Sequence, residues 1–494
     1  MKKPLFIKNA AILTVSSLLL RLFGMAFKIW VASLVGSEGM GLYQLVLSVF
    51  WLFSAFAGSG LSVAATRLCA DNLSLKKDLR GVMKKCFFLT AAVSLTSGGV
   101  MFLSSDVLAR FAVGNESVAL CFKIIAFSLP AIGVSSCIKG YFFAVRKALP
   151  SAVSQILEQS ARIALSFFLV SKTVKYGAAA ACAALSAGDA VSEFICCAFL
   201  YGRYKKDLSC RKGLQKCGCS FKSVHRIAFP LTLGRYLSLF LRTAENILVP
   251  KMLSKAGSGI KSGLSTFGAV KAMALPVLLF PSGILSAVSS LLVPEISAAC
   301  AKNQRLVVRS VTERIMRFTV PVSIVCACVF AVCGNDIGML FYKNGEVGFL
   351  LTVLAPIVPL MYADSVCDGI LKGLDCQRFC FFVGVSDSLI RVLAVLLFLP
   401  RYGIKAFILI MYFSNVYTAF LNTGKLIRKT GVQSDPAKSV LLPLCVSLLS
   451  AKGAEMLFSA FSLPLPLHTA AVCLLSFALS FLFLGREIRT VLAM

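Results

Sequence analysis

The sequence has little histidine, little acid and few charged residues of any kind. Of 494 residues, only 2 are His and 21 are Asp or Glu, against 51 Lys or Arg, and charged residues make up 15% of the chain. So few His leave little material for histidine-based catalysis or for a His-ligated metal. The sequence also lacks a phosphate-binding P-loop and a nucleophile elbow. It therefore predicts a protein that is not an enzyme and that hydrolyses no ATP by itself.

Long apolar runs dominate what is present. Hydrophobic residues make up 58% of the chain, and the mean hydropathy is +0.85. Apolar runs of about 20 residues recur throughout, and each is long enough to cross a hydrocarbon layer of about 30 Å. The start of the chain reads as an uncleaved first span, because no small-x-small cleavage site closes its apolar run. We predict an all-α membrane protein with about fourteen spans, at residues 10–35, 41–69, 84–104, 117–145, 150–171, 177–202, 226–250, 265–298, 314–334, 347–371, 379–399, 403–427, 437–459 and 466–485.

The 19 Cys are scattered through the chain, many of them inside expected spans. This distribution favours small buried thiols over a disulfide framework. Cys210, Cys217 and Cys219 lie close together near His225, but their spacing fits no familiar metal site. We therefore expect no metal centre.

Positive charge alternates along the connections between spans. The N-terminus, every second connection and the C-terminus carry most of the Lys and Arg, including 76–85, 203–216, 302–309 and 425–429. Under the positive-inside rule, both termini then lie in the cytoplasm, with the chain in the plasma membrane. The same placement accounts for the net charge of +30 without nucleic-acid binding. The basic loop at 203–226 could contact anionic membrane lipids.

An internal repeat is visible in the sequence. A shift of 229 positions along the chain carries Pro130, Gly140 and Arg162 onto Pro359, Gly369 and Arg391. The same shift carries Glu158 onto Asp387. Because each copy holds an even number of spans, the repeat is parallel, with a pseudo-twofold axis along the membrane normal. We therefore expect a six-span lobe at 1–204, a basic cytoplasmic linker at 205–222, a second six-span lobe at 223–429 and a two-span appendix at 430–494.

Several cations fall at membrane depth, where exposure to lipid costs about 2.5–3.5 kcal/mol each. Glu158 with Arg162, and Asp387 with Arg391, have the favourable acid-first i,i+4 spacing and are expected to be structural pairs. The remaining cations are our candidates for binding a multiply charged anion in a central cavity, because they have no obvious local partner, except that Arg242 could instead pair with Glu245 three residues later. These candidates are Arg21, Lys28, Arg235, Arg242 and Lys271. For Lys28 and Lys271, the alternative is that they reach the membrane interface.

Two further features are candidates for coupling and motion. Asp364 and Asp368 stand one helical turn apart and could bind a coupling cation, Na⁺ or H⁺, although an internal salt bridge with Lys372 is equally compatible. Asp189 and Glu193 repeat that spacing on the sixth span. Pro276, Pro281 and Gly283 interrupt the eighth span and mark either a hinge or a static kink. No other cofactor is expected.

The stretches RLFGMAFKIWVASLVGSEGMGLYQL (21–45) and LPVLLFPSGILSAVSSLLVPEIS (275–297) resemble the multidrug/oligosaccharidyl-lipid/polysaccharide (MOP) exporter superfamily. Within it, the chain is similar to the polysaccharide-biosynthesis branch that includes stage V sporulation protein B and, more distantly, the lipid II flippases. The resemblance implies a V-shaped two-lobe transporter that works by alternating access, with the last two spans holding the lipid tail. Arg21 matches the first-span arginine of the flippases. Their second first-span arginine falls at Phe27, one residue from Lys28, and their second-span basic pair meets the uncharged 52–60.

The leading hypothesis is a flippase that exports a polyprenyl-diphosphate-linked glycan for peptidoglycan or a surface polysaccharide. Its partners would be that lipid-linked glycan and glycan-synthesis enzymes. One alternative is a drug or organic-cation antiporter of the MATE type, which would need acids exposed in the cavity. The other alternative is a non-transporting membrane scaffold for a glycan-synthesis complex.

Overall fold

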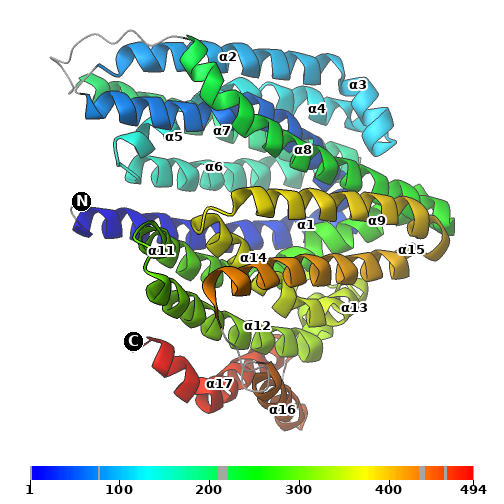
Figure 1. The fold of residues 1–494 in the computed structure, drawn as a ribbon. Helices are drawn as coiled ribbons and strands as arrows, with labels where there is room; N and C mark the ends of the chain where they lie inside the picture. Colours follow the sequence, from blue (N-terminus) through cyan, green and yellow to red (C-terminus); the bar gives the residue numbers. More distant parts are fainter. Residues whose placement is uncertain (1–2, 76–77, 210–220, 433–439, 461–463, 493–494) are drawn as a thin grey trace. The chain divides into compact units, whose positions relative to one another are not determined.

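The computed structural model describes residues 3–75, 78–209, 221–432, 440–460 and 464–492, and these are built from helices joined by short turns (Figure 1). The helices are α1 (Lys3–Ser74), α2 (Arg80–Leu103), α3 (Ser105–Leu108), α4 (Ala119–Ala126), α5 (Leu129–Ala144), α6 (Leu149–Thr173), α7 (Ala178–Ser209), α8 (Phe221–Leu253), α9 (Gly259–Gly268), α10 (Leu275–Leu279), α11 (Ser282–Ala301), α12 (Arg305–Tyr342), α13 (Gly345–Leu354), α14 (Val358–Gly373), α15 (Gln377–Thr430), α16 (Leu442–Ser459) and α17 (Leu465–Leu492). Short 3₁₀ or π-helical turns separate some of them, including η5 (Ala269–Ala274).

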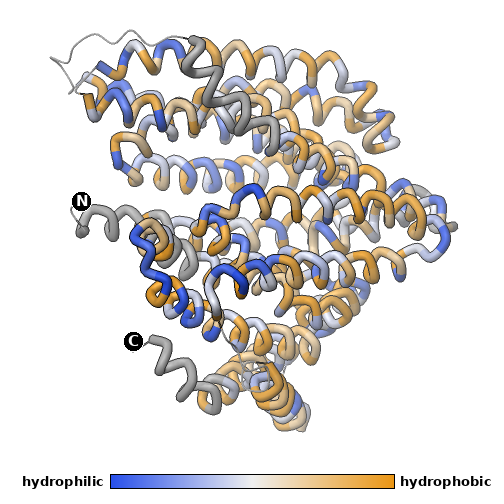
Figure 2. Tube along the Cα trace, in the orientation of Figure 1, coloured by the Kyte–Doolittle hydropathy of each residue, from blue (hydrophilic) through white to orange (hydrophobic). Residues whose placement is uncertain are grey.

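The helices have the length and surface that a membrane requires. Nine helices in the described ranges are long and apolar enough to cross a bilayer. Large apolar side chains point outward, with Leu103 82% exposed and Phe420 77% exposed. Figure 2 shows apolar residues along most helices and hydrophilic residues at helix ends, such as the beginning of α12. The chain is therefore a multi-pass membrane protein, and the all-α prediction is confirmed.

Two of the long helices each contain a glycine break, where the sequence predicts a boundary between spans. In α1, Gly36 has φ 70° and ψ −178°, and in α15, Gly403 has φ 56° and ψ −135°. Side chains other than glycine rarely adopt these angles. The breaks divide α1 and α15 into the pairs of spans expected at 10–35 and 41–69, and at 379–399 and 403–427.

The backbone repeats along the chain as the sequence repeat predicts. Arg146 has φ 59°, and Asp375, its counterpart under the shift that relates Pro130 to Pro359, has φ 58°. Asn115 and its counterpart Asn344 both cap helical turns, because each side-chain oxygen accepts a hydrogen bond from the backbone N–H two residues later. The internal repeat is thus confirmed in the turns of the chain as well as in its residues.

The structure forms two compact units: unit 1 (Met1–Phe27 and Leu34–Leu248) and unit 2 (Lys28–Ser33 and Val249–Met494). This division differs from the lobe boundary expected at 205–222, of which 210–220 lie outside the described residues together with Cys210, Cys217 and Cys219. Most of α8 belongs with unit 1 because it packs on the second part of α1. There, Thr243 Oγ1 donates to the Ser48 carbonyl at 3.1 Å. The lobes at 1–204 and 223–429 remain a division based on sequence.

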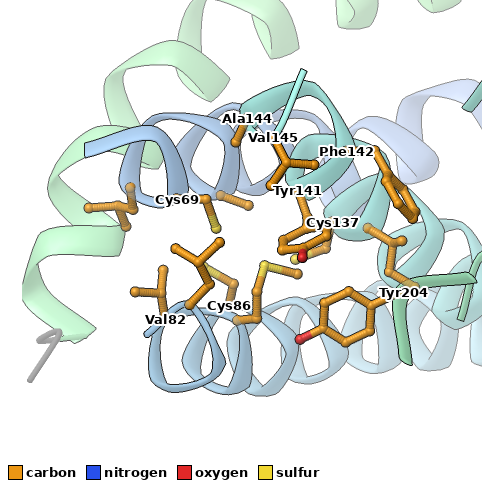
Figure 3. Close-up of a cluster of buried hydrophobic side chains, with 14 of the residues drawn as sticks. Cys69, Val82, Cys86, Cys137, Tyr141, Phe142, Ala144, Val145 and Tyr204 are labelled. Atoms are coloured by element: carbon orange, nitrogen blue, oxygen red, sulfur yellow. The ribbon is translucent and has the colours of Figure 1, made fainter. Parts of the chain in front are cut away.

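The core of unit 1 lies where α5 meets α1, α2 and α7. Figure 3 shows Cys86, Cys137 and Tyr141 inside this cluster of buried side chains, with Tyr204 beside them. The helices approach closely at Gly140, where an added Cβ would lie 2.5 Å from the Ser62 carbonyl oxygen. Glycine therefore lets α5 contact the backbone of α1 directly.

In unit 2, helix α12 packs against α11, α13, α14, α16 and α17. The predicted interruption of the eighth span is present as η5, α10 and a turn at Pro281, after which α11 begins at Ser282. Tyrosines satisfy carbonyl groups at this interruption. Tyr342 donates to the Met273 carbonyl at 3.3 Å, and Tyr362 donates to the Leu278 carbonyl.

Candidate functional site

Unit 1 contains a cavity of about 670 Å³, whose lining combines apolar side chains with several polar ones. Side chains from α1, α5, α6, α7 and α8 line it, and its polar wall includes Lys139, Gln155, Glu158, Gln159, Glu193 and Arg235. Trp51 contributes an aromatic face to the same wall. A cavity of this size, with several convergent polar groups, is large enough to hold part of a small ligand.

Helix α6 supplies much of the polar wall because its polar residues follow the helical period. Gln155, Glu158, Gln159 and Arg162 are three, four and seven positions apart, which places them on one face. Hydrophilic colour runs along α6 in Figure 2, in contrast to most of its neighbours in unit 1.

A chain of charged groups extends from the cavity into the interior of unit 1. Arg162 contacts Glu158 at 3.0 Å and Asp189 at 2.8 Å. Tyr43 donates to the other Asp189 oxygen at 2.6 Å, and Lys139 Nζ lies 3.8 Å from Glu158. Their side chains are largely buried, with Asp189 only 6% exposed and Arg162 21% exposed. The expected Glu158–Arg162 pair is therefore present, but as one link of a longer network.

Glu193 lies one helical turn after Asp189 and also lines the cavity. It is 8% exposed, and the structure records no hydrogen bond or ion pair of its carboxyl group within the described part of the chain. Its charged neighbours are Glu158, Lys139, Arg162 and Asp189. Glu193 is thus a buried acid that faces the cavity without a direct partner.

Among the cations predicted from the sequence, Arg235 lines this cavity and has an exposed side chain. Arg21 and Arg242 are exposed on α1 and α8 of unit 1, and no ion pair of either is recorded among the described residues. Lys28 and Lys271 are counted in unit 2 and are partly buried. Lys271 lies in the π-helical turn η5. The structure therefore brings Arg235 together with Lys139, Glu158 and Glu193, while the other four predicted cations are not part of the cavity wall.

Three acids of unit 2, Asp364, Asp368 and Asp387, have partners within that unit. Lys372 pairs with Asp368, which is the internal salt bridge that the sequence left open. Asn422 donates to Asp364 at 2.7 Å, and Ser414 donates to Asp387 at 2.6 Å. Arg391, the expected partner of Asp387, has a partly buried side chain.

Sequence reasoning did not single out Lys139, Gln155 and Gln159 as site residues. The polar face of α6 is the signal that could have identified Gln155 and Gln159, and a cation inside the apolar span expected at 117–145 is the signal that could have identified Lys139. The contacts themselves join residues far apart in sequence, such as Tyr43 and Asp189, so local spacing gives no direct sign of them.

Comparison with known proteins adds the following likenesses. Residues 6–300 match the family described as polysaccharide biosynthesis protein. Stage V sporulation protein B of Bacillus subtilis (strain 168) is 24% identical over 415 residues, which cover 82% of this chain and 80% of that protein. The solved structure of lipid II flippase MurJ in an inward closed conformation has a TM-score of 0.70 at 14% identity, covering 96% of this chain and 99% of that one.

An inward-facing multidrug resistance transporter of the MATE family, within the MOP superfamily, has a TM-score of 0.65 at 15% identity. That likeness covers 85% of this chain and 100% of the transporter. At these identities the two solved structures indicate a shared fold.

Proposed function

Because this chain belongs to the polysaccharide biosynthesis protein family, we propose that it is a flippase that exports a polyprenyl-diphosphate-linked glycan across the plasma membrane by alternating access. The fold that it shares with a lipid II flippase and a MATE transporter supports a transport function. The similarity to stage V sporulation protein B is consistent with a role in cell-wall or spore glycan assembly.

The observation that carries this proposal is the set of exposed arginines on apolar helices of unit 1. Arg21, Arg235 and Arg242 have exposed side chains, and no carboxylate is recorded against any of them in the described ranges. Arginines at membrane depth are costly unless they meet water or an anion. A diphosphate offers several charged oxygens, and guanidinium groups bind such oxygens with two parallel hydrogen bonds.

Other features fit the remaining parts of such a substrate. The amides, hydroxyls and Trp51 of the cavity wall can contact a hydroxyl-rich headgroup. Lys28 and Lys271 are further candidates for binding the diphosphate.

The break at Pro281, with Pro276 before it and Gly283 after it, is our candidate hinge for alternating access. Tyr342 and Tyr362, which donate hydrogen bonds to carbonyl groups beside this break, would stabilise one of the two states of the hinge. The last two helices, α16 and α17, would hold the lipid tail.

The proposal is tested by flipping of a fluorescent lipid-linked glycan precursor in proteoliposomes that contain the full-length protein. Each charge-assisted hydrogen bond contributes about 1.5–3 kcal/mol, so losing two should slow flipping by roughly 100-fold or more. We therefore expect the double variant Arg21→Ala, Arg242→Ala to be severely impaired. Arg110→Ala, which removes an exposed arginine already paired with Glu116, should flip normally. Unchanged flipping by the double variant would overturn the proposal.

A second candidate function is export of organic cations by a MATE-type mechanism. The specific observation in its favour is that Glu158 and Glu193 line the cavity, because a cationic drug needs an acid to contact. Resistance to cationic dyes on expression, abolished by Glu193→Gln, would support this candidate. A non-transporting scaffold would instead tolerate neutral substitution of every membrane-depth arginine.

The proposal includes an orientation in the membrane. Under the positive-inside rule the basic connections support a cytoplasmic location for both termini, so the glycan would enter from that side and leave on the other. Labelling of single cysteines introduced near Arg428 and near Glu346 in intact cells tests this orientation. Only the site near Glu346 should react with an impermeant reagent.

A further inference from the structure

The buried and partly buried charges beside the cavity of unit 1 do not balance. Three acids, Glu158, Asp189 and Glu193, face two bases, Lys139 and Arg162. Arg235 lines the same cavity, but its side chain is exposed and is not one of these buried groups. If every group were ionised, the buried set would carry one excess negative charge.

The excess charge falls on Glu193. Arg162 contacts both Asp189 and Glu158, and Lys139 lies near Glu158, so these acids have cationic partners. Glu193 is more than nine-tenths buried, faces the cavity, and has no recorded hydrogen bond or ion pair in the residues that the structure describes. A buried carboxylate without a partner is strongly disfavoured, so it binds either a proton or another cation.

The surroundings favour the proton. A metal cation requires several oxygen ligands around it, and here it would also be repelled by the nearby Lys139 and Arg162. A proton needs only one carboxyl oxygen and access to water, and the cavity provides that access. We propose that Glu193 is a proton-binding site that opens into the cavity of unit 1 and exchanges its proton with the solution that the cavity meets.

This exchange can be linked to helix packing through Lys139. Its ammonium lies 3.8 Å from Glu158, near the long limit of an ion pair. When Glu193 loses its proton, the new carboxylate competes with Glu158 for Lys139. Because these three residues stand on α5, α6 and α7, protonation of one acid changes the electrostatic attraction among three helices.

The test uses infrared spectroscopy of the full-length protein in proteoliposomes, and it needs no substrate. Wild-type protein should show the carbonyl stretch of a protonated carboxylic acid that disappears as the pH is raised. Glu193→Gln should abolish this band while keeping the side-chain shape, and Glu455→Gln, at an exposed glutamate of α16, should leave it intact. Size-exclusion chromatography checks that both variants are folded.

Lys139→Met gives a second readout that a merely structural role would not produce. Removing the neighbouring cation disfavours the charged form of Glu193, so the band should persist to higher pH than in wild type. The proposal is overturned if Glu193→Gln leaves the titrating band unchanged. It is also overturned, in favour of a metal-cation site, if replacing choline by Na⁺ at constant pH removes the band. Because no flipping is measured, these outcomes are independent of the glycan proposal.

Discussion

Replacing Arg162 with glutamine removes the guanidinium that bridges two largely buried carboxylates. Arg162 contacts Asp189 at 2.8 Å and Glu158 at 3.0 Å, and the Asp189 side chain is only 6% exposed. Removing one partner of a buried ion pair typically costs about 3–5 kcal/mol, because the other charge stays buried without compensation. We expect Arg162→Gln to lower the free energy of unfolding by about that amount.

The same chain offers a matched control. Arg110 and Glu116 form an ion pair at 3.0 Å, but their side chains are 70% and 73% exposed. Exposed pairs contribute about 0–1 kcal/mol, so Arg110→Gln should cost less than about 1 kcal/mol. The two variants make the same chemical change and differ mainly in the burial of the pair.

The assay is reversible denaturation in detergent micelles, followed by tryptophan fluorescence, for Arg162→Gln, Asp189→Asn and the double variant. The double variant should be more stable than the sum of the single losses predicts, because each single change leaves an unpaired partner. Two results would refute the reasoning: an Arg162→Gln loss no larger than that of Arg110→Gln, or additive losses in the double variant.

Further predictions concern the backbone of the two repeats. Gly140→Ala should lower the free energy of unfolding by about 1–3 kcal/mol, because its Cβ would lie 2.5 Å from the Ser62 carbonyl oxygen. Gly369→Ala is the repeat-related change and places its Cβ in open space, so it should be neutral or slightly stabilising in the same denaturation assay. Equal losses for the two would contradict the close approach. Gly36→Ala should lower the free energy of unfolding by about 1–3 kcal/mol, because alanine is strained at the positive φ of this position. Unaltered thermal stability would contradict the need for glycine at the break in α1. Tyr362→Phe should lower the free energy of unfolding by about 1–3 kcal/mol, because the Leu278 carbonyl at the interruption of the eighth span loses its hydrogen-bond donor. An unchanged thermal unfolding temperature would contradict a stabilising role of this hydrogen bond.

The fold was largely predictable from the sequence because membrane helices are specified by local properties. Run length and charge placement predict the spans, and the breaks at Gly36 and Gly403 fall where glycine interrupts apolar runs. The internal repeat could be read from a few prolines, glycines and charges. The boundary between compact units was less accessible, since it depends on how α8 packs against α1, as in the Thr243–Ser48 hydrogen bond.

The candidate site was predictable only in part. The spacing of Glu158 and Arg162 predicts their contact, but it does not reveal that Asp189 and Lys139 join the same network. Those partners come from other helices, and a single sequence carries no direct record of such pairings. The exposed arginines Arg21 and Arg242 were identified from hydropathy alone. Their role in binding a diphosphate stays a prediction.

The matched turns of the two repeats have a consequence for how such a protein can diversify. Arg146 and Asp375 hold nearly the same left-handed backbone angle with opposite charges, and Lys139 has Asp368 as its counterpart in the other copy. The path of the chain is thus shared between the copies, while their charged chemistry has diverged. One copy can therefore acquire charged groups for one task while its twin acquires them for another, with no change to the scaffold that both inherit.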